Sequence, residues 1–245
     1  MDIDAVVNDA LKYPYQSLPR VLILGAVPLG ALLIALVVML LLTFTSSDLA
    51  LAVSVVVGSA LLFISGLFVA GYFIRVIESS LNGEDDLPDF SNQGELLVNG
   101  LKLLVVQVVY LLIPTLVIIL CLWIIYSASV HSILVVIMLT SILVILLLFL
   151  FSMFLIMATA HLAATGSIKE ALRFSVVQQK IATIGWGTYT LWYLLMLVLG
   201  MVGVVAMAFI SIIPILGSFV GWVLVQPYLE ILLARSVALV YLSAQ

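Results

Sequence analysis

The stretch that decides the fold runs from Ile133 to Ala160 and reads ILVVIMLTSILVILLLFLFSMFLIMATA. It contains no charged side chain. A helix needs about 20 apolar residues to cross the roughly 30 Å hydrocarbon core of a bilayer, so this stretch is long enough to do so. A strand of a membrane β-barrel would instead alternate apolar and polar residues over about ten positions. The stretch therefore predicts a transmembrane helix.

Five further apolar stretches of similar length lie before and after this one. They are Val21–Thr43, Leu49–Ile74, Leu103–Tyr126, Ile184–Ile210 and Phe219–Tyr241. Short polar segments separate the two members of each successive pair, and longer charged segments lie between the pairs. The short segments are Phe44–Asp48, Ser127–Ser132 and Ser211–Ser218. This pattern predicts an all-α integral membrane protein with six transmembrane helices in three hairpins.

The composition excludes several classes of protein. Of the 245 residues, 66% are hydrophobic and 8% are charged, whereas a soluble domain has about 45–50% apolar and about 25% charged residues. A soluble globular domain and a disordered chain are both excluded. The net charge is −4, so the chain does not have the excess of basic residues that nucleic-acid binding requires. Cys121 is the only cysteine, so there is no disulfide framework, and we expect no metal site and no cofactor.

The basic residues are distributed unevenly between the two kinds of loop. All eight lie outside the three hairpin tips, which contain only Asp48 and His131 as charged or titratable groups. The basic residues are Lys12, Arg20, Arg75, Lys102, Lys169, Arg173, Lys180 and Arg235. Because Lys and Arg are enriched in cytoplasmic loops, both termini and the long loops are expected in the cytoplasm. The chain is therefore expected to be a multi-pass protein of the cytoplasmic membrane.

A short segment with amphipathic helical spacing precedes each hairpin. These segments begin near Asp2, Asn92 and Ser167, and such apolar stripes are typical of helices that lie in the membrane interface. Each segment can alternatively be a cytoplasmic continuation of the span that follows it. With this pattern, the chain is expected to form a single membrane domain of three pseudo-repeats, at residues 2–91, 92–166 and 167–245.

Three segments together resemble a known family. They are Leu11–Pro14 (LKYP), the stretch from Gly71–Ile77 (GYFIRVI) to Leu81–Phe90 (LNGEDDLPDF), and Ala164–Ser167 (ATGS) followed by Ala171–Phe174 (ALRF). The chain resembles a family of archaeal multi-pass membrane proteins classed as a domain of unknown function. The resemblance implies a multi-helix integral protein of an archaeal cytoplasmic membrane. It implies no activity and no catalytic residues.

The loop after the second span contains a cluster of four acidic residues, Glu84, Asp85, Asp86 and Asp89. Asn82-Gly83 is a turn signal that can end the helix before this cluster. The carboxylates are close enough in sequence to bind a hard cation such as Ca²⁺ or Mg²⁺, although the full twelve-residue calcium pattern is absent. The loop can also be a docking patch for a basic partner. The third interpretation is a solvated acidic turn that pairs with Lys102 or Arg75.

Glu230 is the ionisable residue that lies deepest in an apolar run. Counted from Phe219 at about 1.5 Å per residue, it lies near the middle of the membrane. It follows Gln226 and Pro227, and the proline removes a helix hydrogen bond. Together with Arg235, Gln226 and Glu230 form a possible intramembrane polar site. Glu230 is either a proton or cation site on a conduction path or a partner in an interhelical ion pair or hydrogen bond, with Arg235 and Arg75 as the candidate partners.

Three other polar positions have ordinary structural interpretations. Arg75 and Glu78 are one helical turn apart and are expected to pair with each other. His161 is either a pH-sensitive group or a hydrogen-bonded cap at the end of the fourth span. Trp192, like the other tryptophans near span ends, is expected to be an interfacial anchor.

The sequence contains no catalytic motif, neither a zinc-protease pair nor a phosphate loop nor a nucleophile elbow. We therefore expect a protein that is not an enzyme. The first hypothesis is a membrane scaffold or accessory protein that organises membrane lipids or partner subunits, with a homo-oligomer as one form that it can take. The alternative is a transporter or channel for a small ion or solute, with a path near Glu230.

Overall fold

The computed structural model of the chain describes residues 1–44, 47–127, 129, 133–213 and 216–244. Within these residues the structure is helical and has no strand. The helices in chain order are α1 (Ile3–Lys12), η1 (Tyr13–Ser17), α2 (Leu18–Thr43), α3 (Asp48–Leu81), α4 (Gln93–Ser127), α5 (Ile133–Thr165), α6 (Ile168–Ala171), α7 (Phe174–Ile184), α8 (Trp186–Ile210), α9 (Leu216–Val220), η2 (Gly221–Val225) and α10 (Gln226–Leu242). Parts of the three expected hairpin turns, with His131, lie outside the described residues.

Six helical stretches are long and apolar enough to cross a membrane, which confirms the six expected spans. They are α1 to α2, α3, α4, α5, α8, and α9 to α10. The chain is therefore a multi-pass membrane protein. Several helices exceed the length of their expected span. With 34 residues, α3 is roughly 51 Å long, about 20 Å more than a bilayer core requires.

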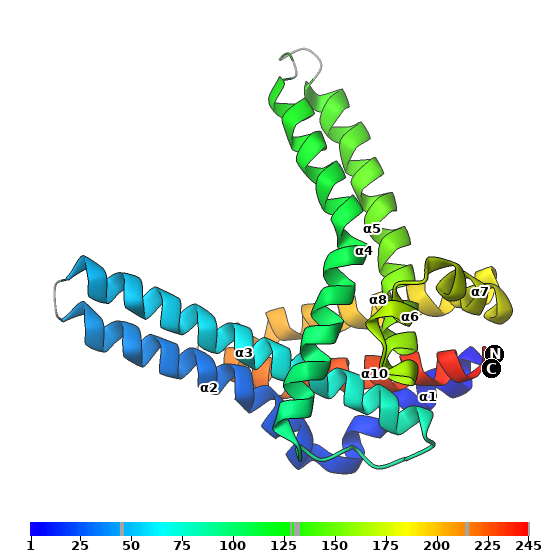
Figure 1. Ribbon diagram of the computed structural model, residues 1–245, viewed down its shortest axis with the longest axis horizontal. Coiled ribbons are helices and arrows are strands. Elements are labelled where there is room, and N and C mark those ends of the chain that lie inside the picture. The colour runs from blue at the N-terminus through cyan, green and yellow to red at the C-terminus, as the bar shows by residue number, and fades with distance from the viewer. Residues whose placement is uncertain (45–46, 128, 130–132, 214–215, 245) are drawn as a thin grey trace.

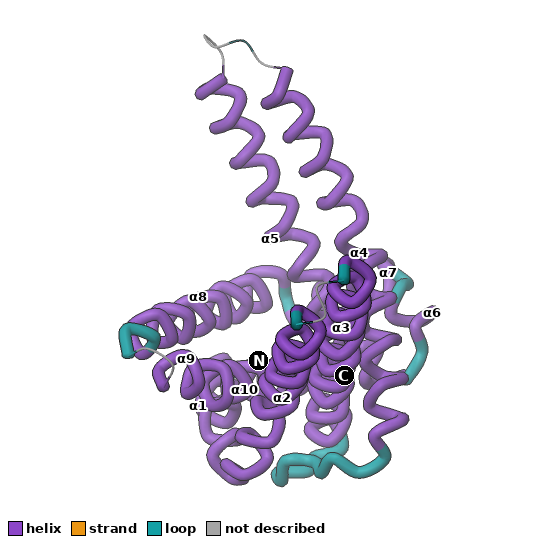
Figure 2. The backbone as a smooth tube through the Cα atoms, turned by 90° about the vertical axis from the view of Figure 1, so that its left-hand side faces the viewer, coloured by secondary structure: helices purple, strands orange, loops and turns teal. Residues whose placement is uncertain are grey.

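The additional length forms a compact base from which three apolar arms extend. The α2–α3 arm and the α4–α5 arm leave the base in different directions (Figure 1), and α8 leads away in a third direction (Figure 2). In the most apolar 18-residue window of α5 no residue is buried, whereas 56% are buried in the window of the last span. The arms thus present apolar side chains outward, and α10 lies mostly inside the molecule.

The base is built from the ends of the long helices together with α1, α6, α7 and α10. Its core contains buried side chains from all of these elements, among them Tyr13, Tyr72, Leu96, Met157, Ala171, Ile181, Trp192 and Ile231. The base has an aromatic and aliphatic core of the kind found in soluble proteins, and most of the polar contacts between elements also occur in it.

Two expected interfacial residues take part in this core. The prediction that Trp192 anchors the protein at the interface is wrong, because its side chain is fully buried. Its indole N–H donates to Ser236 Oγ at 2.7 Å. His161 is buried as well, and its Nδ1 lies 2.8 Å from the hydroxyl of Tyr241. Of the two interpretations of His161, the geometry matches a hydrogen-bonded group.

The three amphipathic segments fold in two different ways. Before the first hairpin, α1 is a separate helix whose N-cap, Asp2, accepts from the Ala5 N–H. Before the third, α7 is also separate, and it is followed by Gly185, whose φ of 96° favours glycine. Before the second hairpin the expectation of a separate helix is wrong. That segment is the beginning of α4, which continues without a break from Gln93, because its apolar residues, such as Leu96 and Leu103, are buried in the base as part of the same helix.

Two glycines allow α3 and α4 to cross in close contact. A Cβ atom at Gly71 would lie 1.8 Å from the carbonyl oxygen of Leu96, and one at Gly100 would lie 1.9 Å from that of Leu67. Both distances are to backbone atoms, which a side-chain rotation cannot move away. The first two hairpins are therefore joined, at the base, through a contact that requires glycine on each helix.

Candidate functional site

Arg235 is the centre of the polar network in the base. Its Nε donates to Asp9 Oδ1 at 2.7 Å, and its Nη2 donates to Asp85 Oδ1 at 2.9 Å. Nη1 donates to the backbone carbonyl of Glu84 at 2.9 Å. The guanidinium also lies over the Tyr13 ring, 4.6 Å from its centroid. One side chain of α10 thus connects the N-terminal helix with the loop that follows α3.

That loop, residues 83–92, is called the acidic loop below. It begins where α3 ends, at a turn in which Gly83 has φ of 78°, as Asn82-Gly83 predicts. The Tyr13 hydroxyl donates to the Asp86 carbonyl at 3.1 Å, and the Tyr72 hydroxyl donates to the Pro88 carbonyl at 2.8 Å. These bonds hold the loop backbone against the base from two helices.

Aromatic and cationic contacts fix the second half of the acidic loop. The Phe90 ring stacks on Tyr72 with a centroid distance of 4.5 Å. Arg75 donates to the backbone carbonyls of Asp89 and Ser91 and pairs with Glu95 at 3.2 Å. The expected pair of Arg75 with Glu78 is wrong. Arg75 extends across to the loop and α4, because more acceptors are available there than on its own helix.

Three of the four acidic side chains of the loop have separate partners. Glu84 accepts from Ser79 Oγ at 2.7 Å, Asp85 pairs with Arg235, and Asp89 accepts from Ser91. The hydrogen bonds from the Ser91 hydroxyl and backbone N–H lower the pKa of the Asp89 carboxyl from its ordinary value. The Asp86 side chain is exposed. Among the described residues no group of three or more His, Cys, Asp or Glu side chains is placed to hold a metal ion.

Two of the three members of the expected intramembrane site are in contact, and the third lies elsewhere. Gln226 Nε2 donates to Glu230 Oε1 at 3.0 Å, so these two residues form a contact one turn apart. Arg235 instead faces Asp9 and Asp85 in the base. Neither Arg235 nor Arg75 forms an ion pair with Glu230 within the described part of the chain. The pairing alternative for Glu230 is therefore wrong for both arginines, and Gln226 is its hydrogen-bond partner.

The backbone before Gln226 adapts to Pro227. The five residues Gly221–Val225 form one turn of π-helix, and the N–H of Gln226 donates to the carbonyl of Gly221, five residues earlier. A π turn of this kind commonly lies next to a functional site. The same turn packs closely on α2, since a Cβ at Gly25 would lie 2.4 Å from the Val223 carbonyl oxygen.

Glu230 lines two cavities, one on each side of the contact between α5 and α10. The smaller cavity has a volume of about 330 Å³ and lies between α3, α4, α5 and α10. The larger has a volume of about 670 Å³ and lies between α5, α8 and α10. Ile156, Glu230 and Leu233 line both. Both volumes fall in the range of about 300–1,000 Å³ that ligand pockets occupy.

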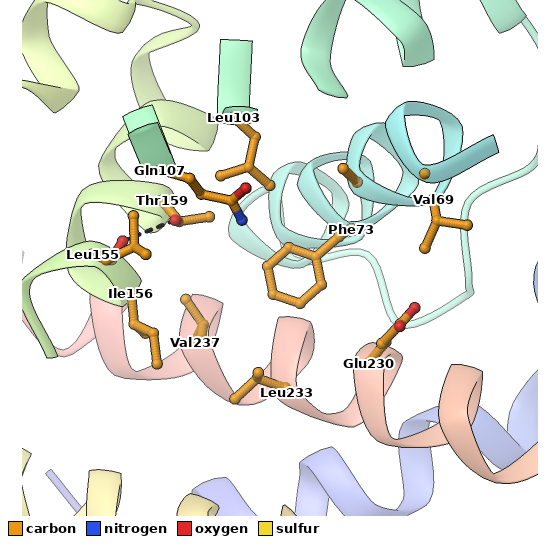
Figure 3. A pocket seen from close by; sticks show the side chains of 12 residues that line it. Val69, Phe73, Leu103, Gln107, Leu155, Ile156, Thr159, Glu230, Leu233 and Val237 are labelled. Carbon is orange, nitrogen blue, oxygen red and sulfur yellow. Dashed lines mark hydrogen bonds between the residues drawn. The ribbon is translucent and has the colours of Figure 1, made fainter. Parts of the chain in front are cut away.

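The walls of the smaller cavity are mostly apolar, with three polar side chains (Figure 3). Thr159 donates to the Leu155 carbonyl of its own helix at 2.8 Å. The Gln107 amide points into the cavity beside Leu103 (Figure 3). The Glu230 carboxylate points toward Val69 and Phe73 from the opposite wall (Figure 3). A carboxylate in such surroundings can accept a proton or bind a cation that enters the cavity.

Sequence reasoning missed part of this site. Gln107 is a polar residue inside an apolar run, and that signal alone could have indicated it. Gly66 and Gly200, which line the smaller and larger cavities, are spaced like ordinary helix glycines and gave no such signal. Asp9 lies in the amphipathic segment before the first hairpin, and its pairing with Arg235 depends on tertiary contacts that helical spacing does not indicate.

Comparison with known proteins identifies a family but no individual relative. No curated protein and no solved structure matches this chain. The family described as "Protein of unknown function (DUF4013)" matches residues 54–212, which extend from within α3 to just past the end of α8 and include the acidic loop. Because the match covers more than half of the 245 residues, the chain belongs to this family of unknown function.

Proposed function

We propose that this chain is a non-enzymatic membrane scaffold that organises lipids or partner subunits around its three arms. The observation that carries the proposal is the division between base and arms. The ion pairs of the described residues all lie in or beside the base, where they hold elements together. The arms leave large apolar side chains exposed, such as Leu139, Leu146 and Val204, which lipids or partner helices can cover.

The proposal also includes the membrane in which the protein lies and the kind of organism from which it comes. The base carries most of the basic residues, so by the positive-inside rule it faces the cytoplasm with both termini. The resemblance to archaeal proteins supports an archaeal cytoplasmic membrane. The three pseudo-repeats, at residues 2–91, 92–166 and 167–245, would each supply one arm to a single domain, and a homo-oligomer would bring several sets of arms together.

Substitutions on the exposed surface of one arm test the scaffold proposal, because they leave the base unchanged. Leu139, Leu143 and Leu146 of α5 are exposed, so replacing all three by Ala removes apolar surface from one arm without creating a cavity. The wild type should retain a reproducible set of lipids or membrane proteins when it is purified from native membranes and analysed by mass spectrometry. The triple variant should lose part of that set.

The matched control replaces Leu33, Leu36 and Leu40 by Ala, three exposed residues of the α2 arm. It should lose a different part of the bound set, because the two arms extend in different directions. A wild type that purifies as a monomer with no retained lipid or protein contradicts the scaffold. Proton- or cation-driven flux in liposomes that the Glu230→Gln variant lacks would favour the transporter alternative, which the position of Glu230 beside two cavities supports.

A further inference from the structure

The Glu230 carboxylate has no cationic partner within the described residues. The four ion pairs there involve Arg75, Arg173 and Arg235, and none includes Glu230. Gln226 donates to Oε1, and no hydrogen bond from a described residue reaches Oε2. A carboxylate among apolar side chains loses most of its hydration, and a paired cation offsets that cost. The nearest arginine on the same helix, Arg235, is already bound to two aspartates.

The larger cavity next to this carboxylate is elongated and apolar. Its lining on α8 extends from Tyr193 to Val205, a length of roughly 18 Å along the helix axis. Met201 and Val204 form part of this lining and are 60% and 62% exposed. The cavity is therefore bordered by residues of an arm surface, from which a membrane-dissolved molecule can enter without crossing the base.

Two further features favour the larger cavity over the smaller as the place for a ligand chain. Its volume is about twice as large. It also has Gln226 and Glu230 together in its wall, and Gln226, whose amide binds Glu230 Oε1, lines this cavity and not the smaller one. Gly200 faces this space, since a Cβ atom added there meets nothing within 4 Å.

We propose that the larger cavity binds a lipophilic amine, a molecule with one protonated nitrogen and an apolar chain. The nitrogen pairs with Glu230 beside Gln226, and the chain lies along α8 past Gly200. The positive charge complements a carboxylate that no described residue neutralises, and the chain fills apolar volume. This assignment goes beyond the proposed scaffold role, because it does not depend on which lipids or proteins the arms hold.

The test measures binding of dodecylamine and of 1-dodecanol, which has the same chain length but no charge at neutral pH. The full chain is placed in phosphatidylcholine nanodiscs, and bound probe is counted by native mass spectrometry. Dodecylamine should bind one molecule per chain, at least about tenfold more tightly than the alcohol, as expected for a charge-assisted hydrogen bond. Glu230→Gln should reduce the affinity for the amine to that for the alcohol.

Two matched pairs of variants distinguish binding at this site from general effects of charge and of added side-chain volume. Asp48→Asn removes one negative charge at the start of α3, far along the chain from the cavity lining, and should leave amine binding unchanged. Gly200→Leu should fill the larger cavity and abolish binding. Gly66→Leu projects into the smaller cavity, also with nothing within 4 Å of the new Cβ, and should leave binding unchanged.

Three results would overturn the proposal. One is equal affinity for amine and alcohol, and another is unchanged amine binding in Glu230→Gln. The third is a block by Gly66→Leu and not by Gly200→Leu, which would put the chain in the smaller cavity. Because binding is measured on the isolated chain, these results are independent of whether partners or native lipids co-purify, which is the test of the scaffold role.

Discussion

Arg235 combines features that a lysine could not replace. Its planar guanidinium donates to two carboxylates and one backbone carbonyl while one face covers the Tyr13 ring, whereas an ammonium is a single point charge. The Arg235 side chain is only 6% exposed, but Asp9 and Asp85 are 45% and 80% exposed. The arginine is therefore the desolvated partner, and its removal affects α1, the acidic loop and α10 together.

Replacing Arg235 by Ala should lower the free energy of unfolding by about 2–4 kcal/mol, since it removes several charge-assisted hydrogen bonds and a buried stem. It should also expose the acidic loop to proteases. Arg173→Ala is the matched control, because Arg173 pairs only with Glu170 on the surface and should cost less than about 1 kcal/mol. Denaturant titration in detergent micelles, followed by near-UV circular dichroism, measures both. Equal losses in the two variants would refute the central role of Arg235.

The partners of Arg235 could not be predicted from the sequence. Asp9 and Asp85 are 226 and 150 positions away in the chain. Hydropathy and helical spacing report on neighbours within a few turns, so they suggested Glu230, five residues earlier, as a partner. The contact between Gln226 and Glu230 joins positions i and i+4, and such a local contact was within reach of the sequence.

The helices show the same difference between features that depend on neighbouring residues, which the sequence predicts, and features that depend on contacts between distant segments, which it does not. The six spans follow from continuous apolar runs, a local property, and the structure confirms them. The boundaries of α3, α4 and α5 extend beyond the apolar runs, because their ends are buried in the base, where polar and apolar residues mix. The separate helix expected near Asn92 does not form because the apolar stripe of that segment packs directly in the base as part of α4.

The close crossing of α3 and α4 depends on Gly71. Gly71→Ala should destabilise the protein by about 1–3 kcal/mol, since the new methyl group would overlap the Leu96 carbonyl and force the two helices apart. Gly66→Ala on the same helix meets nothing within 4 Å and should be neutral or stabilising by up to about 1 kcal/mol, because alanine favours helix over glycine. Thermal unfolding in one detergent compares the two. A Gly71→Ala variant as stable as Gly66→Ala would mean that the helices do not cross closely at this glycine.

At the scale of the whole molecule, the base and the arms obey different physical constraints. The base contains the four ion pairs of the described residues and buries aromatic side chains such as Tyr13, Tyr72 and Trp192, so polar contacts and a packed core hold it together. The arms expose leucine, valine and isoleucine along most of their length, which water disfavours and lipid accepts. In a flat bilayer about 30 Å thick, the three arms can cross together only if they turn toward a common direction, with tilts of up to about 40°. The contacts between arms and base are then the places where that turn occurs.

If the arms cross the bilayer in a common direction, their tips lie on the side opposite to the base. Single cysteines are placed at Asp48 and Ser211, beside arm tips, and at Asp86 and Lys169 in the base, in a Cys121→Ala background; all four positions are exposed. If the base faces the cytoplasm, a membrane-impermeant maleimide should label Asp86 and Lys169 only from the cytoplasmic side of sealed vesicles. It should label Asp48 and Ser211 only from the opposite side. Labelling of Asp48 and Asp86 from the same side would contradict an α3 that crosses the membrane, and reversed labelling of all four would place both termini outside.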